Sequence, residues 1–173
     1  MTEKQQSILN SALSLFADKG FDAVPTSLIA KDAGVSEGLI FRHFENKAGL
    51  LNAIMKIGEE KMKEELARVS LIESPGERVM AIMELPFHID EIDYPFWRLV
   101  YSLKWQRSNY NEELAQPIRE MLAAALTELK YADIEAEVDL IESYLDGFAT
   151  TILLKGDSVN KERLLQTLRK KYN

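Results

Sequence analysis

The spacing of apolar residues limits this chain to helices more strictly than any other feature of its sequence. Apolar side chains recur every three or four residues along nearly its whole length, and convincing strand alternation is not found. Near the N-terminus, Ile8, Ala12, Leu15 and Phe16 form one such stripe, which ends at Gly20. We therefore predict an all-α fold.

Residues that start and stop helices divide the chain into about nine predicted segments. Thr2 followed by Gln5 is a capping box, and Ser74-Pro75-Gly76-Glu77 combines a serine cap, a first-turn proline and a glutamate at the third position. Pro86 should kink or break the helix that Ser74 begins. The predicted helices cover about residues 2–20, 26–33, 36–44, 46–69, 74–86, 93–108, 111–131 (or 117–131), 133–155 and 158–171.

The composition is that of a globular protein without disulfides. Of 173 residues, 46% are hydrophobic and 28% are charged, which is enough apolar material for a core. There is no run of 18 apolar residues, the N-terminus does not resemble a signal peptide, and there are no cysteines. These features predict a cytoplasmic protein without a membrane span.

The net charge of −7 argues, on its own, against a nucleic-acid partner, because phosphate binding normally needs a basic face. The charge is unevenly distributed, however. Residues 1–49 hold five basic and six acidic residues, whereas residues 50–173 hold 16 and 22. The first segment is therefore nearly neutral, and the remainder carries most of the acid.

Residues 26–44 have the pattern of two short helices joined by a turn. Ala30 is small where two helices would cross, and Gly34 follows where the chain must leave the first helix, with a positive φ expected. Val35 and Ile40 supply apolar contacts that would hold the second helix, together with Phe44. These features predict a helix-turn-helix, whose second helix enters the major groove of DNA.

Residues 8–51 resemble the N-terminal DNA-binding region of the TetR family of bacterial transcriptional regulators. The matching elements are LFADKGF, the IAKDAGVS turn and the run FRHFENK. The resemblance implies a helix-turn-helix DNA-binding domain over residues 1–46, and a helical ligand-binding and dimerisation domain over residues 47–173.

The resemblance also implies roles for individual residues. Positions that approach bases or the nearby backbone are Ser27, Glu37, Gly38, Leu39, Phe41 and Arg42, and positions that contact phosphates are Thr26, His43 and Lys47. Glu37 stands where the family often has lysine, Leu39 where threonine is frequent, and Phe41 where tyrosine is frequent. Leu39 and Phe41 suit apolar contacts such as thymine methyl groups, whereas Glu37 suits cytosine or repels a phosphate.

A region rich in aromatic residues and methionine surrounds Pro86 in the sequence. Its members are Met80, Met83 and Phe87 before the next helix, and Trp97, Tyr101 and Trp105 at four-residue spacing along that helix. Such stripes usually belong to a core, although their density also suits an adaptable apolar pocket. The resemblance implies that an effector binds in this region, and the residues suggest a small, largely apolar one.

The helix predicted after Asp133 has two apolar stripes. One stripe, Val138, Ile141, Leu145, Phe148 and Ile152, would face the core of the subunit. The other needs a further partner, and together with the last helix it predicts a two-fold dimer interface made of Leu140, Tyr144, Gly147, Thr151, Leu154, Leu165 and Leu168. The alternative is a fully internal helix in a monomer.

Catalysis has little support in this sequence. No arrangement suggests an activated nucleophile, and no glycine-rich phosphate loop is present. His88 precedes Asp90, Glu91 and Asp93, but a solvated acidic turn explains this run better than a metal site or an enzyme. We expect neither a metal nor another cofactor.

These observations predict a homodimeric, ligand-responsive DNA-binding regulator, a repressor that binds a palindromic operator. The alternative is a helical small-molecule binding protein whose helix-turn-helix no longer reads DNA, as Glu37 and the near-neutral first segment suggest. The identity of the effector, the operator sequence and the regulated genes stay open.

Overall fold

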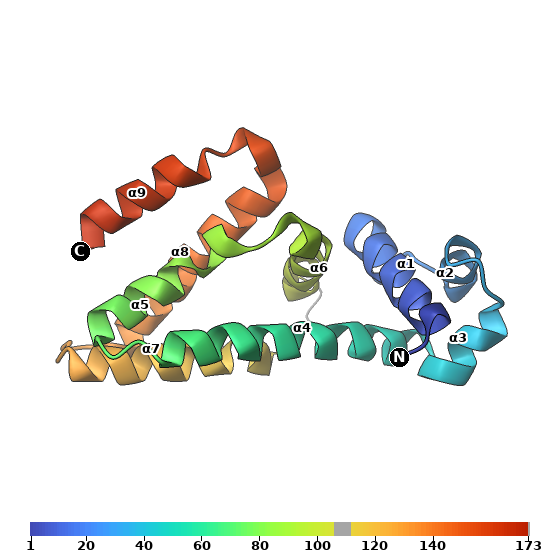
Figure 1. The fold of residues 1–173 in the computed structure, drawn as a ribbon, viewed down its shortest axis with the longest axis horizontal. Coiled ribbons are helices and arrows are strands. Elements are labelled where there is room, and N and C mark those ends of the chain that lie inside the picture. The colour runs from blue at the N-terminus through green and yellow to red at the C-terminus, as the bar shows by residue number, and fades with distance from the viewer. Residues whose placement is uncertain (106–111, 173) are drawn as a thin grey trace. The chain divides into compact units, whose positions relative to one another are not determined.

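The computed structural model describes residues 1–105 and 112–172, and every regular element in those ranges is helical (Figure 1). The α-helices are α1 (Glu3–Lys19), α2 (Thr26–Asp32), α3 (Glu37–Phe44), α4 (Lys47–Ser70), α5 (Pro75–Glu84), α6 (Tyr94–Trp105), α7 (Gln116–Glu128), α8 (Ile134–Lys155) and α9 (Lys161–Tyr172). Short 3₁₀ turns are η1 (Leu85–His88), η2 (Glu91–Asp93), η3 (Glu112–Ala115) and η4 (Gly156–Ser158). The predicted all-α fold is confirmed; the predicted helix end near Ser108 and start near Asn111 lie outside the described residues.

The capping residues in the sequence correctly predicted where most of the helices begin. The Thr2 hydroxyl accepts a hydrogen bond from the Gln5 amide at 3.3 Å, and the Asp133 carboxylate accepts one from Ala136 at 3.1 Å. Ser36 precedes α3 as expected but makes no side-chain capping bond. Of the two outcomes predicted for Pro86, the structure has the break and not the kink: α5 ends at Glu84, and the proline lies in the 3₁₀ turn η1.

The helices form two compact units, each described by itself. The first contains Met1–Met62 together with α6, and the second contains Lys63–Glu91 together with α7, α8 and α9. This division does not coincide with the boundary predicted after residue 46, because most of α4 and the whole of α6 group with the N-terminal helices. The helix α4 continues from the first unit into the second.

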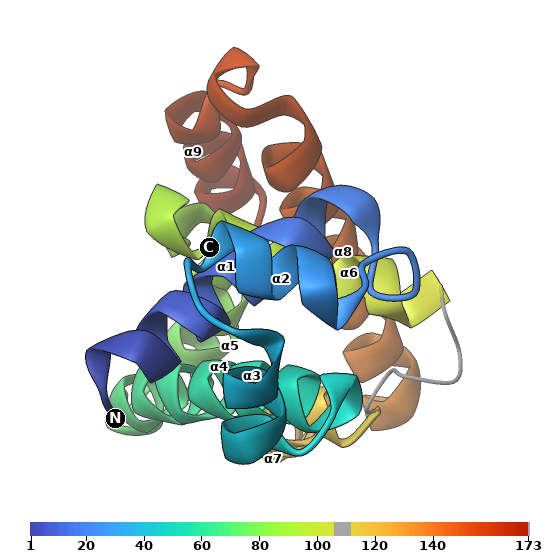
Figure 2. The ribbon, with the colours of Figure 1, turned by 90° about the vertical axis from the view of Figure 1, so that its right-hand side faces the viewer.

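In the first unit, α1 packs against α2 and α6, and α2 packs against α3 (Figure 2). The predicted stripe of α1 is buried, with Ile8, Ala12 and Phe16 fully inaccessible. Gly58 of α4 lies against the ring of Phe96 in α6, and a β-carbon at this glycine would overlap the ring. The absence of a side chain at Gly58 therefore lets α4 and α6 approach closely.

In the second unit, α5 packs against α7 and α8, and the predicted core stripe of α8 faces inward. Val138, Ile141 and Ile152 are buried, and the ring of Phe148 lies 5.0 Å from that of Phe87. No helix in the described ranges combines the length and the apolar character that crossing a membrane requires.

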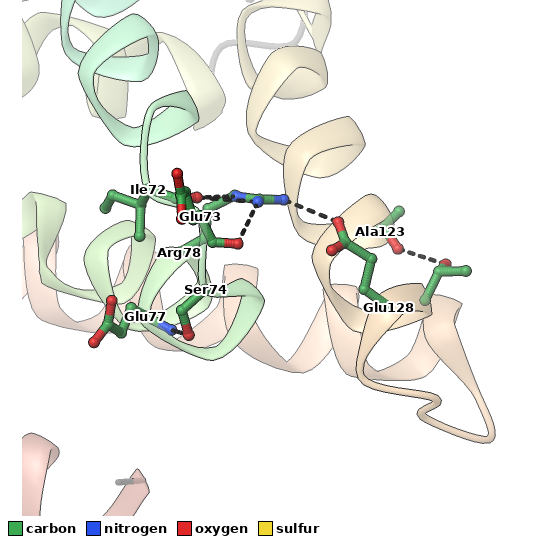
Figure 3. Close-up of polar contacts among 8 residues, drawn as sticks. Ile72, Glu73, Ser74, Glu77, Arg78, Ala123 and Glu128 are labelled. Carbon is green, nitrogen blue, oxygen red and sulfur yellow. Dashed lines mark hydrogen bonds and ion pairs between the residues drawn. The ribbon is translucent and has the colours of Figure 1, made fainter.

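The loop that follows α4 is held by Arg78 (Figure 3). The Arg78 guanidinium donates to the carbonyl oxygen of Ile72 at 3.0 Å and 3.1 Å, and to that of Glu73 at 3.3 Å. It also donates to the Glu128 carboxylate, near the end of α7, at 3.1 Å. One side chain thereby joins the end of α4, the start of α5 and the end of α7.

Candidate nucleic-acid interface

The turn between α2 and α3 has the backbone that the sequence predicts. Gly34 has a φ of 68°, the left-handed conformation that glycine adopts without strain. The Val35 amide donates to the Ala30 carbonyl at 3.0 Å, which closes the turn directly after α2. Ala30 and Ile40 are buried at 4% and 0% exposure, so they hold the two helices together. Residues 26–44 therefore form the predicted helix-turn-helix.

The outer side of α3 carries several of the residues predicted to meet DNA. Phe41 is 45% exposed, although it is a large apolar side chain, and Arg42 and His43 beside it are also exposed. Gly38 is exposed, with open space where a side chain would stand. We call Gly38, Phe41, Arg42 and His43 the α3 face. Leu39 is half-buried next to it.

Two other predicted DNA residues contact each other. The Thr26 hydroxyl donates to the Glu37 carboxylate at 2.5 Å, and both side chains are half-buried. This bond joins the first residue of α2 to the first residue of α3. Ser27, directly after Thr26, is exposed.

Lys47 is occupied within the chain. Its ammonium group donates to the carbonyl oxygens of Phe21, Asp22 and Val24, at 2.8, 3.3 and 3.1 Å, and lies 4.5 Å from the centre of the Phe21 ring. All three of its N–H donors are therefore used on the turn between α1 and α2, and a phosphate contact would require at least one of these bonds to break. Sequence reasoning missed this role, because no local pattern marks the carbonyls that a lysine will reach.

His43, at the end of α3, is linked to the start of α1. Its Nδ1 atom lies 3.3 Å from the side-chain nitrogen of Gln5, and its ring makes an edge contact with Phe44. The other side of the Gln5 amide accepts a hydrogen bond from the backbone of Thr2 at 2.8 Å. The capping box of α1 therefore extends to the α3 face.

The residues predicted to bind an effector are divided between the two units. Met80, Met83 and Phe87 are buried in the second unit, at 9%, 3% and 8% exposure. Trp97 and Tyr101 are half-buried in the first unit. The side chain of Trp105 lies outside the described part of the chain.

Most of the residues predicted for the dimer interface lie on an open side of α8. Leu140 and Leu154 are 51% and 78% exposed, and Gly147 between them has open space where a side chain would stand. Tyr144, Thr151 and Leu165 are half-buried. Leu168 differs, because it is only 4% exposed within its own chain. Its side chain packs within its own chain, and its place in a dimer interface stays a prediction.

His88 does not contact the carboxylates that follow it in the sequence. Its Nε2 atom lies 3.6 Å from the Glu84 carboxylate, which Arg169 of α9 holds with two bonds of 2.6 and 2.7 Å. Hydrogen bonds from Arg169 lower the pKa of the Glu84 carboxyl below its usual value, although burial opposes them. Sequence reasoning missed this ion pair, in which only Glu84 is buried and whose partners are 85 residues apart.

Comparison with known proteins identifies the helix-turn-helix region. Residues 8–54 match the family model of bacterial regulatory proteins, tetR family. The chain is 34% identical over 89 residues to the HTH-type transcriptional regulator AcrR of Shigella flexneri, a match that covers 51% of this chain. The matches span 41% of AcrR and 29% of a second curated relative, which is less than half the length of each.

Solved structures share the fold over nearly the whole chain. The fatty acid degradation regulator FadR of Bacillus halodurans superposes with a TM-score of 0.78 at 19% identity, covering 98% of this chain and 94% of its own. AibR, solved with isovaleryl coenzyme A and operator DNA, gives a TM-score of 0.74 at 21% identity, with 96% of each chain covered. Residues 8–54 therefore match the tetR family of bacterial regulatory proteins, and the likeness in fold extends beyond them over nearly the whole chain.

Proposed function

We propose that this chain is a transcriptional regulator that recognises duplex DNA with α3. The observation that carries the proposal is the α3 face, where a 45% exposed phenylalanine, Phe41, stands beside Arg42 and His43 on a helix anchored by the inaccessible Ile40. A rigidly held helix with exposed side chains of this kind suits the major groove. The match of residues 8–54 to the tetR family model supports the same interpretation.

The α3 face suggests how bases would be recognised. Arg42 presents a guanidinium, which pairs with the two acceptors of guanine, and Phe41 presents a ring suited to a thymine methyl group. Gly38 has no side chain to keep the helix away from the DNA. Thr26 and Glu37 hold each other, so we assign them first to fixing the angle between α2 and α3.

We propose that the regulator acts as a homodimer joined through the open side of α8. Leu140 and Leu154 are large, exposed apolar side chains on one helix, and burial of such a surface favours association. Gly147 lies between them and lets a partner helix approach closely. A two-fold dimer would present two copies of α3 to the half-sites of a palindromic operator, about 34 Å or slightly more apart.

We propose that a small, largely apolar effector controls DNA binding. Met80, Met83 and Phe87 support this, because methionine adapts its shape to apolar ligands. AibR was solved with both a coenzyme A ester and operator DNA, so a related fold accommodates both kinds of ligand. The effector would bind one arrangement of the dimer more tightly than another and so increase the population of that arrangement. In a repressor, the favoured arrangement would be the one that releases the operator. We propose that this takes place in the cytoplasm.

A binding assay with DNA that flanks the gene for this protein tests the proposal. We expect fluorescence anisotropy to show salt-sensitive binding that prefers this duplex to a shuffled one of equal composition. Arg42→Ala should weaken binding about tenfold or more, in keeping with the ~1–3 kcal/mol of a base-specific contact. Lys170→Ala removes the same charge from an exposed site in α9 and should change the affinity much less.

The same DNA-binding assay, together with a ligand-binding assay, distinguishes the proposed regulator from the alternative, a small-molecule binding protein. Binding of small apolar molecules, detected by a ligand-induced rise in melting temperature, would persist in a protein that has lost DNA recognition. If the wild type shows such ligand binding and no preference for any duplex, the regulator is refuted and a small-molecule binding protein is favoured.

A further inference from the structure

Gln5, in the first turn of α1, makes two contacts that together determine the chemical form of His43. Its side-chain oxygen accepts a hydrogen bond from the backbone nitrogen of Thr2 at 2.8 Å. Its side-chain nitrogen lies 3.3 Å from Nδ1 of His43, which is 38 residues away in the sequence. Both ends of the amide are therefore engaged.

The first contact fixes the orientation of the amide. The two ends of a glutamine side chain look alike, but a backbone N–H can only donate, so the atom facing Thr2 must be the oxygen. The atom facing His43 is then the NH₂ group, which can only donate. Nδ1 must accept this bond and so carries no proton. A neutral imidazole has one ring proton, and here it is on Nε2.

We propose that Gln5 is a positioning residue for DNA binding: it keeps the ring proton of His43 on Nε2, where it can be donated to a DNA phosphate. The inference rests on the proposed function. His43 is exposed, and its hydrogen bond to Gln5 uses Nδ1, which leaves Nε2 to face a ligand. The opposite tautomer would turn a lone pair toward the phosphate oxygen, which also only accepts.

Gln5→Glu reverses the polarity of this contact and should preserve the helix. Glutamate is as suitable as glutamine at the third position of a capping box, so the bond to Thr2 is kept. The carboxylate, however, can only accept, and Nδ1 of His43 must then carry a proton to bond with it. Gln6→Glu is the matched control: it adds the same charge to the same turn, at an exposed residue that bonds to Asn10 rather than to His43.

The tautomer can be read directly in the full-length protein. The chain has two histidines, so long-range ¹H–¹⁵N spectra of histidine-labelled protein contain two sets of ring signals, and those of His88 serve as an internal reference. At about pH 8.5 we expect the ring proton of neutral His43 on Nε2 in the wild type and in Gln6→Glu. In Gln5→Glu we expect a proton on Nδ1. Identical His43 signals in the two variants would overturn the inference.

DNA binding completes the test. We expect Gln5→Glu to bind the flanking duplex at least about tenfold more weakly than Gln6→Glu, the size of one hydrogen bond to a charged group. A changed tautomer with equal affinities would overturn the positioning role. If the wild type itself does not bind DNA, the proposed function fails and the role of the proton fails with it. The spectra still report the contact between Gln5 and His43 in that case, so the two failures can be distinguished.

Discussion

Lys47→Met tests whether this ammonium group braces the turn between α1 and α2 or contacts DNA. The group donates to three carbonyl oxygens, at 2.8, 3.3 and 3.1 Å, and lies over the Phe21 ring. Methionine keeps an unbranched side chain with good helix propensity, so the substitution removes the charge and the donors and little else.

The structure sets the size of the expected effect. A hydrogen bond from a charged group contributes about 1.5–3 kcal/mol, and a cation–π contact at an exposed site about 0.5–1 kcal/mol. The three carbonyls share one ammonium group, so their bonds are not additive, and we count them as one strong bond plus the ring contact. On this basis Lys47→Met should lower the free energy of unfolding of the first unit by about 2–4 kcal/mol.

Urea unfolding followed by tryptophan fluorescence measures this loss. Trp97 and Trp105 both belong to α6, so the signal reports on the first unit. With a urea dependence of about 2 kcal/mol per M, the midpoint should fall by roughly 1–2 M at a fixed protein concentration. Lys56→Met, at an exposed site on the same helix, is the control and should change stability by less than about 0.5 kcal/mol.

Equal midpoints for the Lys47 and Lys56 variants would refute the bracing role. The salt dependence of DNA binding supplies a second criterion, because each phosphate contact contributes about 0.9 to the slope of log affinity against log salt. If the folded Lys47→Met protein keeps the wild-type salt slope, Lys47 stabilises the turn and does not contact phosphate. A slope reduced by about 1.8 would show instead that both subunits use this lysine on phosphates.

Three further predictions concern packing, an ion pair and assembly. Gly58→Ala should lower the free energy of unfolding, measured in urea, by about 1–2 kcal/mol. The reason is that overlap of the added β-carbon with the Phe96 ring outweighs the gain in helix propensity. A variant as stable as the wild type would show that α4 and α6 are not this close. Arg169→Met should lower the melting temperature near pH 7, because it leaves the buried Glu84 carboxylate without its main partner. Because the folded state lowers the pKa of Glu84 from the usual 4.5, this stabilisation is present above that pH and lost below it, so melting curves of the two proteins should converge in acid. Leu154→Glu should yield a folded monomer by sedimentation and circular dichroism, because it places a charge within the proposed dimer contact. An unchanged dimer would show that the interface lies elsewhere.

Much of the fold was predictable because its determinants are local. The capping box of Thr2 and Gln5 and the positive φ of Gly34 each depend on a few neighbouring residues, and the structure has both. Burial of Ile40 and exposure of Phe41 follow from the helical period of α3 once its limits are known. Helix starts, the helix-turn-helix and the core stripes were therefore within reach of the sequence.

The contacts that the sequence did not predict join residues far apart in the chain. Lys47 reaches carbonyls 23 to 26 residues earlier, and Arg169 reaches Glu84 across 85 residues. In each case many exposed charges of the same kind compete as candidates, and only the tertiary arrangement selects one. The grouping of α6 with α1, rather than with its neighbours in sequence, has the same origin.

The two cations that bind carbonyl groups near the ends of α4 have a mechanical consequence. Lys47 is the first residue of this helix and grips the turn before α2, while Arg78 grips the loop that follows the last turn. Helices usually dissipate strain by fraying at their ends, where backbone hydrogen bonds are fewest. With each end fastened within its own unit, α4 should fray less at both ends than a helix whose ends are free.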